Sequence, residues 1–197
     1  MWFKDVVLES NSVTLSPLRT EHAEALVSAA SDGNLWELWY TSIPNKESVG
    51  DYIRAALAEK EQGLALPFVV IDRASGKIIG STRFCHADIG NQRVEIGYTW
   101  YSKSFQRSSI NTECKLLLLS HAFETLDAIA VEFRTHWHNQ ASRNAIARLG
   151  AKQDGILRNH QKTPEGLYRD TVVFSIINLE WTAVKTSLQH RLARHSG

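Results

Sequence analysis

The segment from Phe105 to Phe123, FQRSSINTECKLLLLSHAF, passes from a small polar loop directly into a strongly apolar helical pattern. The first amide groups of a helix lack intrahelical acceptors, and the helix dipole adds positive potential at that end. A phosphate can therefore bind there without many basic side chains. Because most helix starts rich in Ser and Asn are only caps, this segment predicts an anion site only with support from elsewhere in the chain.

The elements that must position this helix start follow from hydrophobic periodicity and turn residues. Residues 92–101 alternate as a strand, residues 109–126 follow a helical pattern, and residues 128–136 are rich in β-formers. A strand, a helix and a second strand in this order form a right-handed crossover between parallel strands. Ligands of open mixed sheets gather at the carboxyl ends of such strands.

The rest of the chain extends this sheet and covers it. A helix over about 139–149 ends at Gly150, and a final helix spans about 180–194. The order of elements, without repeats or low-complexity linkers, predicts one α/β (α+β) domain over residues 1–197, with helices on the faces of a mixed sheet. Further strands are expected at 5–9, 12–18, 65–72, 77–87, 153–160 and 168–179, and further helices at 21–30 and from after Lys46 to about 61.

Composition and charge exclude several classes of protein. The chain has 197 residues, 43% of them hydrophobic and 22% charged, which suffices for one substantial core. A formal net charge of +1 argues against dedicated nucleic-acid binding, although Lys185 to Arg194 is locally basic. No run approaches 18 apolar residues and the first residues lack an apolar export segment, so neither membrane insertion nor export is expected. We expect a cytoplasmic protein in which Cys85 and Cys114, which lack metal-site spacing, stay reduced.

Four segments stand in order along the chain: EIGYTW (95–100), FQRSSINTE (105–113), HNQASRNAIARLGA (138–151) and GLYRDTVVFSI (166–176). Together they resemble the GCN5-related N-acetyltransferase (GNAT) superfamily, and within it most closely the ribosomal-protein N-terminal acetyltransferases. The resemblance spans essentially the whole chain and implies a mostly antiparallel central sheet with a splayed parallel pair and helices on both faces. It also implies acetyl-CoA as co-substrate, no metal, and direct attack of a primary amine on the bound thioester.

The resemblance assigns the polar loop to the pyrophosphate of acetyl-CoA. Such enzymes carry the pattern Gln/Arg-x-x-Gly-x-Gly/Ala here, and Ser109 and Asn111 replace its two glycines. Amides inside a first helical turn need only ordinary helical dihedrals to point at an anion, so small polar residues still suit the role. The expected cofactor contacts are Gln106, Arg107, Ser108, Ser109, Ile110, Asn111 and Thr112.

The helix that starts at Asn139 gains two roles from the resemblance. Asn139 would meet the pantetheine arm, although a helix cap is its natural use at this position. Ser142 lies three residues later on roughly the same helix face and would donate a proton to the departing thiolate. The family's alternative tyrosine is absent, because Asn144 stands two residues further on.

Gly97 bears on how the pantetheine arm reaches the sheet. A glycine inside a strand often marks a bulge or a close backbone approach. By resemblance, this strand splays so that the arm pairs with free backbone groups. Trp100 and Tyr101 would then contact the cofactor mainly through their backbone, while plain core packing accounts for their side chains.

Acetyl transfer to an amine requires a neutral nucleophile, a polarised thioester carbonyl and a proton source for the thiolate. An α-amine, with a pKa of ~8, is neutral far more often at neutral pH than a lysine side chain. Its attack therefore depends less on a catalytic base. Glu95 is the candidate base, and it would take the proton directly or through water. A purely structural role, as a solvated or ion-paired carboxylate, accounts for its presence equally well. Glu132 is a second candidate for the base. Strand alternation predicts Glu95, Gly97 and Thr99 on one face and Ile96, Tyr98 and Trp100 on the other.

The acceptor site is less well defined by the sequence. Tyr168, Arg169 and Asp170 are candidates, although an ion pair between Arg169 and an acidic neighbour is the commoner use of such residues. The aromatic cluster around Trp36, Trp39 and Tyr40 lies where, by resemblance, the chain overhangs the acceptor. Core packing is its default role, whereas exposure would favour a peptide N-terminus or an apolar amine over a highly charged substrate.

Other functions have weaker support. Strand neighbours such as Cys85 and His86 point to opposite faces, which argues against a thiol hydrolase. His136 and His138 share a face if the strand continues, yet they lack a third metal ligand at motif spacing. The main alternative is a non-catalytic CoA-binding sensor or interaction module, which would keep the phosphate seat and discard the acid–base groups. The acceptor, peptide or small molecule, and the oligomeric state, including a homodimer, stay open.

Overall fold

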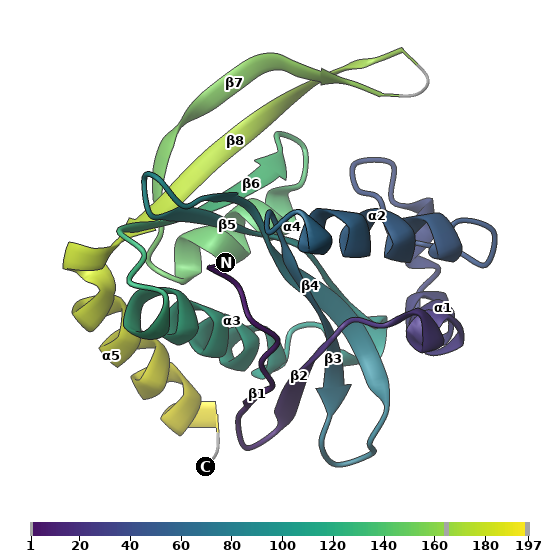
Figure 1. Cartoon of the computed structure of the whole chain (residues 1–197), viewed down its shortest axis with the longest axis horizontal. Coiled ribbons are helices and arrows are strands. Elements are labelled where there is room, and N and C mark those ends of the chain that lie inside the picture. The colour runs from purple at the N-terminus through teal and green to yellow at the C-terminus, as the bar shows by residue number, and fades with distance from the viewer. Residues whose placement is uncertain (1, 164–165, 196–197) are drawn as a thin grey trace.

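The computed structural model describes residues 2–163 and 166–195, which form one eight-stranded sheet with helices on both faces (Figure 1). The strand order is β1-β2-β3-β4-β5-β6-β8-β7. The strands are β1 (Leu8–Glu9), β2 (Val13–Pro17), β3 (Leu66–Asp72), β4 (Ile78–Asp88), β5 (Arg93–Tyr101), β6 (Ala130–His136), β7 (Lys152–Lys162) and β8 (Tyr168–Ile177). The longer helices are α1 (Ala23–Ser31), α2 (Val49–Glu61), α3 (Ile110–Ser120), α4 (Gln140–Arg148) and α5 (Asn178–His195).

Two hydrophobic clusters divide the helices between the faces of the sheet. In the largely buried strand β3, Phe68 and Val70 pack into the cluster that also holds residues of α3, α4 and α5. Val69 points the other way, into the cluster with α1 and α2. This alternation is what a strand buried on both faces requires. The predicted layers, helices on both faces of a mixed sheet, are therefore confirmed.

Strands β5 and β6 form the parallel pair of the sheet, and they separate after three residue pairs. The pairs are Arg93 with Ala130, Val94 with Val131 and Glu95 with Glu132. Beyond Glu95, β5 continues to pair only with β4, and β6 only with β8. The gap between β5 and β6 thus opens toward their carboxyl ends, which confirms the predicted splay and parallel crossover.

A bulge in β5 changes which side chains share a face. Tyr98 has a φ of +52°, and the pairing with β4 shifts between Ser81 and Arg83. After this shift Thr99 faces α3, where Lys115 Nζ donates to Thr99 Oγ1 at 2.7 Å. The Tyr98 ring instead lies 3.9 Å from the Arg83 guanidinium carbon, on the α2 side. The predicted alternation through Tyr98 and Thr99 is therefore wrong, because a bulge inserts an extra residue and reverses the parity.

Several element boundaries differ from those predicted. The first strand is only Leu8–Glu9, and the helix predicted over 109–126 is α3 followed by a π-helical turn at His121–Thr125. Short 3-10 turns occupy Thr20–His22, Leu35–Glu37 and Lys103–Phe105. Within residues 2–163 and 166–195, no helix combines the length and the apolar character needed to cross a membrane.

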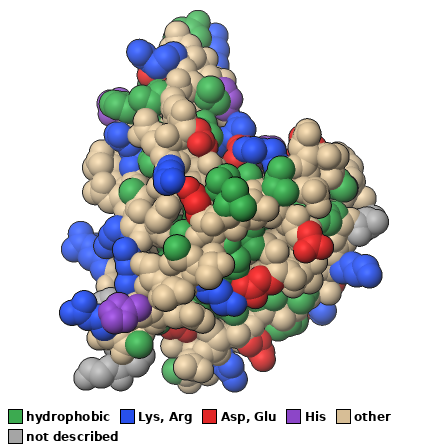
Figure 2. All heavy atoms as spheres, turned by 90° about the vertical axis from the view of Figure 1, so that its left-hand side faces the viewer, with side chains coloured by type: hydrophobic (Ala, Val, Ile, Leu, Met, Phe, Trp, Pro, Cys, Tyr) green, Lys and Arg blue, Asp and Glu red, His purple; other side chains and the backbone are tan. Residues whose placement is uncertain are grey.

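Strands β7 and β8 form a hairpin that extends beyond the body of the sheet (Figure 1). Every residue of β7 except Gly155 is exposed. Figure 2 shows this hairpin as a projecting ridge at the top of the molecule, with hydrophobic and basic side chains on its surface. Strand β6 pairs its last residue, His136, with Thr171 of β8, so the residues of β8 that precede Thr171, toward the hairpin turn, border the open side of the splay.

Candidate functional site

The loop between β5 and α3 forms a concave array of backbone amides. Arg107 has a left-handed φ of +62°, and such a turn before a helix brings successive N–H groups together. Within the described chain the amide of Ile110 donates to Ser108 Oγ at 3.3 Å. The amides at 107–109, 111 and 112 have no acceptor among the described residues. The segment therefore offers unpaired donors at a helix N-terminus, the arrangement that fits a phosphate.

Glu113, in the first turn of α3, holds this loop against the β1–β2 turn. Its carboxylate is 7% exposed and accepts from Ser10 Oγ at 2.6 Å, from the Ser12 amide at 3.2 Å and from Ser109 Oγ at 3.0 Å. Ser109, which replaces the first glycine of the family pattern, thus helps to fix the loop. The sequence reasoning missed Glu113, although an acidic residue in a first helical turn is a recognisable signal.

Two of the predicted cofactor residues lie within the core. The side chains of Trp100 and Tyr101 are 6% and 8% exposed and pack into opposite hydrophobic clusters. Gln106 Nε2 donates to the Tyr101 carbonyl at 2.9 Å, which joins the amide loop to the end of β5. The two side chains are therefore core residues, and contact of their backbone groups with the cofactor stays a prediction.

The start of α4 is capped by Asn139. Its Oδ1 accepts from the Ser142 amide at 3.0 Å, so the cap is confirmed and occupies the amide oxygen. Among the described residues, the Asn139 amide group and the Ser142 hydroxyl have no side-chain hydrogen bond of their own. Both groups are therefore available to a ligand, and their cofactor and acid roles stay predictions.

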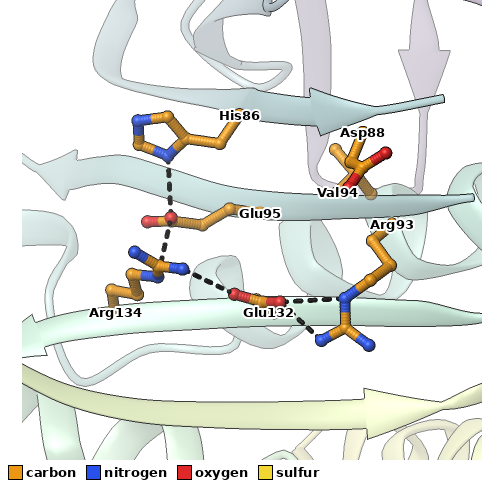
Figure 3. A pocket seen from close by; sticks show the side chains of 7 residues that line it. All are labelled: His86, Asp88, Arg93, Val94, Glu95, Glu132 and Arg134. Carbon is orange, nitrogen blue, oxygen red and sulfur yellow. Dashed lines mark hydrogen bonds and ion pairs between the residues drawn. The ribbon is translucent and has the colours of Figure 1, made fainter. Parts of the chain in front are cut away.

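Glu95 is the buried member of a chain of charged side chains on β4, β5 and β6 (Figure 3). Its side chain is 8% exposed, and its Oε2 lies 2.8 Å from His86 Nδ1 and 3.5 Å from Arg134 Nε. Arg134 continues to Glu132 at 3.1 Å, and Glu132 also accepts from Arg93 Nε at 3.1 Å. These residues line a pocket of about 140 Å³. Among the described residues, the fixed cation nearest to Glu95 is Arg134. Glu132 is instead held by two arginines, so it is the poorer proton acceptor.

His86 reaches Glu95 because β4 is irregular at this point. His86 has a φ of +50°, and the register with β5 shifts between Cys85 and Asp88. As a result the ligand atoms of Cys85, His86 and Glu95 lie within 4.8 Å of one another, so the prediction that Cys85 and His86 point apart is wrong. The hydrogen bond to Glu95 raises the pKa of His86, and burial opposes it. The exposed ring of His86 thus connects a buried carboxylate to solvent.

Cys85 does not become a nucleophile through this proximity. Burial raises the pKa of the Cys85 thiol well above its ordinary value, and the nearby Glu95 charge adds to that effect. A thiol that stays protonated is inert. The fixed positive charge of Arg134 beside Glu95 also opposes a metal cation at this cluster.

The sequence matches a family model described as an acetyltransferase (GNAT) domain over residues 12–152, which is more than half of the chain. The chain belongs to the GNAT acetyltransferase family. The predicted superfamily is thereby confirmed, and the splayed strands, the amide loop and α4 described above belong to a GNAT domain.

Individual relatives agree with this assignment. A Bacillus subtilis protein named "Putative ribosomal N-acetyltransferase YdaF" is 30% identical over 110 residues, which cover 56% of this chain and 59% of that protein. A GCN5-related N-acetyltransferase from Brucella melitensis superposes with a TM-score of 0.86 at 29% identity, covering 96% of this chain and 86% of that one. RimL, named a ribosomal L7/L12 alpha-N-protein acetyltransferase, superposes with a TM-score of 0.78 at 19% identity over 89% of this chain and 96% of that one, and shows the fold alone. The name of the Bacillus subtilis relative agrees with the predicted ribosomal-protein branch of the superfamily.

On the open side of this GNAT domain, an aromatic residue covers the end of β6. Trp39 is 63% exposed, and its ring lies 5.0 Å from that of His136 and 5.7 Å from that of His138. Trp36 is instead partly buried and packs against the cluster of α1 and α2. Of the aromatic residues predicted to overhang the acceptor, Trp36 thus packs in the core and Trp39 is exposed.

The ion pair expected for Arg169 does not form. Asp170, its neighbour, pairs with Arg158 at 2.6 Å, and the Arg169 side chain has no hydrogen bond or ion pair among the described residues. Adjacent residues of a strand point to opposite faces, so Asp170 cannot serve Arg169. The partners of Glu95 are Arg134 and His86, which the sequence alone did not identify. Arg134 could have been predicted from strand alternation, because it lies two residues after Glu132. The bulge that turns His86 toward Glu95 has no clear sequence signal.

Proposed function

We propose that this GNAT domain transfers the acetyl group of acetyl-CoA to a primary amine, a peptide N-terminus or a small molecule, by direct attack without an acetyl-enzyme. The observation that carries the proposal is a juxtaposition at the open end of the β5–β6 splay. The unpaired amides at 107–109, 111 and 112, the capped start of α4 and the buried Glu95 all adjoin this gap. Phosphate binding, thiolate protonation and amine deprotonation require groups of these three kinds.

The residues that would hold acetyl-CoA are the amides from Arg107 to Thr112, with Gln106 fixing the loop and Asn139 beside the pantetheine arm. The fit rests on donors that lack acceptors in the protein, since unpaired amides at a helix start favour an anion. The backbone groups of Trp100 and Tyr101 on the β6 side, apart from the Tyr101 carbonyl that accepts from Gln106, would bond the arm. When bound, acetyl-CoA supplies the activated acetyl group.

Glu95 would accept the proton of the attacking amine, directly or through a water. Its carboxylate is buried, and His86 at 2.8 Å connects it to solvent. Ser142 would give a proton to the thiolate from the opposite element of the splay. A positioned general base contributes typically ~10²–10⁴-fold, so Glu95→Gln should lower kcat by that order.

Free-thiol release in the presence of acetyl-CoA and a panel of amines tests the proposal. The panel should compare peptide α-amines, lysine side chains and small amines, with the products identified by mass. Glu113→Gln and Glu95→Gln make a useful pair, because the first loosens the phosphate loop and the second leaves it intact. Binding of acetyl-CoA without turnover of any acceptor would instead favour the CoA-binding sensor.

The remaining expectations stay part of the proposal. A cytoplasmic location agrees with Cys85 and Cys114, which are free and buried. A single domain over residues 1–197 agrees with one continuous sheet through the described residues. A peptide acceptor is suggested by the name of the Bacillus subtilis relative, whereas specific nucleic-acid binding and membrane contact are not proposed. A homodimer stays a prediction, to be read from light scattering.

A further inference from the structure

Arg169 is a half-buried cation without a counter-charge. Its Nε atom is buried and has no hydrogen-bond partner, and no carboxylate among the described residues lies within ion-pair distance. Other arginines of the same sheet are all paired: Arg83 with Glu59 at 3.3 Å, Arg93 with Glu132 at 2.5 Å, Arg134 with Glu132 at 3.1 Å and Arg158 with Asp170 at 2.6 Å. Among these charges, Arg169 alone is left without a partner.

The strand register places Arg169 on the face that carries Glu95. Strand β6 pairs His136 with Thr171 of β8, and Glu132 lies beside Glu95 of β5. Cross-strand partners share a face, and so do residues two apart on one strand. Arg169, two residues before Thr171, therefore lies on the same face as His136 and Glu95.

The groups around Arg169 describe an open, partly apolar site. Burial lowers the pKa of Arg169, and the Glu95 charge acts against this effect. Burial also lowers the pKa of His136, and the positive charge of Arg169 contributes to that shift. Above His136 lies the exposed ring of Trp39. Arg169 is thus close enough to both residues for their charges to interact, between the candidate base and the aromatic overhang.

A buried donor without a partner is costly, and a ligand that completes its hydrogen bonds is one way to offset that cost. A guanidinium matches a carboxylate in two parallel hydrogen bonds. We propose that the amine acceptor carries a carboxylate and that Arg169 binds it while the amine lies at Glu95. This inference rests on the proposed acetyl transfer. It narrows the acceptor class to amino acids or to peptides with an acidic residue near the N-terminus.

Matched acceptors test the proposal. The probes are four tripeptide amides, Ser-Asp-Ala, Ser-Asn-Ala, Ser-Glu-Ala and Ser-Gln-Ala, in which each acid is compared with its neutral isostere. At least one acidic member should exceed its isostere tenfold or more in kcat/KM, mostly through KM. Arg169→Gln should remove this preference and Arg169→Lys should restore part of it. Arg158→Gln, a change to a paired arginine on the same hairpin, should keep the preference.

The outcomes separate this proposal from the acetyl transfer on which it rests. Turnover without a preference for the acidic members, or an equal loss in Arg158→Gln, overturns the role of Arg169. Absence of turnover with any amine counts against acetyl transfer, and calorimetric binding of the same four peptides to wild type and Arg169→Gln then decides the carboxylate site. A second readout needs no acceptor: Arg169→Met should raise Tm by about 2–4 °C by removing an uncompensated charge, whereas a lower Tm would contradict the premise.

Discussion

Lys115 is a buried charge whose energetic cost can be measured directly. The residue is 5% exposed, and its Nζ donates to Thr99 Oγ1 beneath the β5 bulge. Burial lowers the pKa of Lys115 from 10.5 to about 8. At ~1.36 kcal/mol per pKa unit, a shift of this size corresponds to roughly 3 kcal/mol of destabilisation while the ammonium stays charged. Because the folded pKa is lowered, this cost is complete below about pH 8 and is relieved as the pH rises toward 10.5.

Replacement by a neutral side chain of similar length should remove that cost. We expect Lys115→Met to raise the free energy of unfolding at pH 7 by about 2 kcal/mol, which is the relieved desolvation less ~1 kcal/mol for the lost hydrogen bond. Above pH 8 this advantage over wild type should shrink by about 1.4 kcal/mol per pH unit. Cys85 and Cys114 also titrate in this alkaline range, and their raised pKa values lower stability there in both proteins, so the comparison uses the difference between variant and wild type.

Urea unfolding of wild type and variant in half-unit steps from pH 7 to 10.5 measures the difference. Lys77→Met is the matched control, because Lys77 is exposed and its replacement should change the free energy of unfolding only slightly. A Lys115→Met difference that is independent of pH would show that the ammonium is not desolvated. Destabilisation at pH 7 would show that its contact with Thr99 outweighs burial.

Three further predictions concern the site. Asn139→Ala should weaken CoA binding measured by calorimetry, and Ser142→Ala should mainly lower kcat; equal activity of both variants and wild type would remove their assigned roles. His86→Gln should remove the limb of the kcat/KM profile that rises with pH through the raised pKa of His86, because only the neutral ring can accept a proton from Glu95; an unchanged profile would exclude His86 from the proton path. Glu113→Gln should lower the free energy of unfolding by ~1–3 kcal/mol and raise the KM for acetyl-CoA, since three donors lose a charged acceptor; a KM equal to that of wild type would show that the loop holds its shape without Glu113.

The relation between sequence and structure is clearest along β5. Alternation predicts the strand, and its place before a helix and a second strand predicts the parallel pair, because chain connectivity restricts how such units assemble. The positions of Glu95 and of the amide loop follow from the same reasoning. The reversal of faces at Tyr98 does not, since a bulge depends on pairing with β4 that no local pattern encodes.

The partners of the charged residues show the same division. Sequence alone identified Glu95, the helix start at Ser109 and the Asn139 cap, because each is defined by a local pattern of backbone and side chain. Tertiary structure decided that His86 turns toward Glu95, that Asp170 pairs with Arg158, and that Arg169 is left without a counter-charge. Those facts depend on strand register and on contacts between residues far apart in the chain, where a shift of one residue moves a side chain to the opposite face.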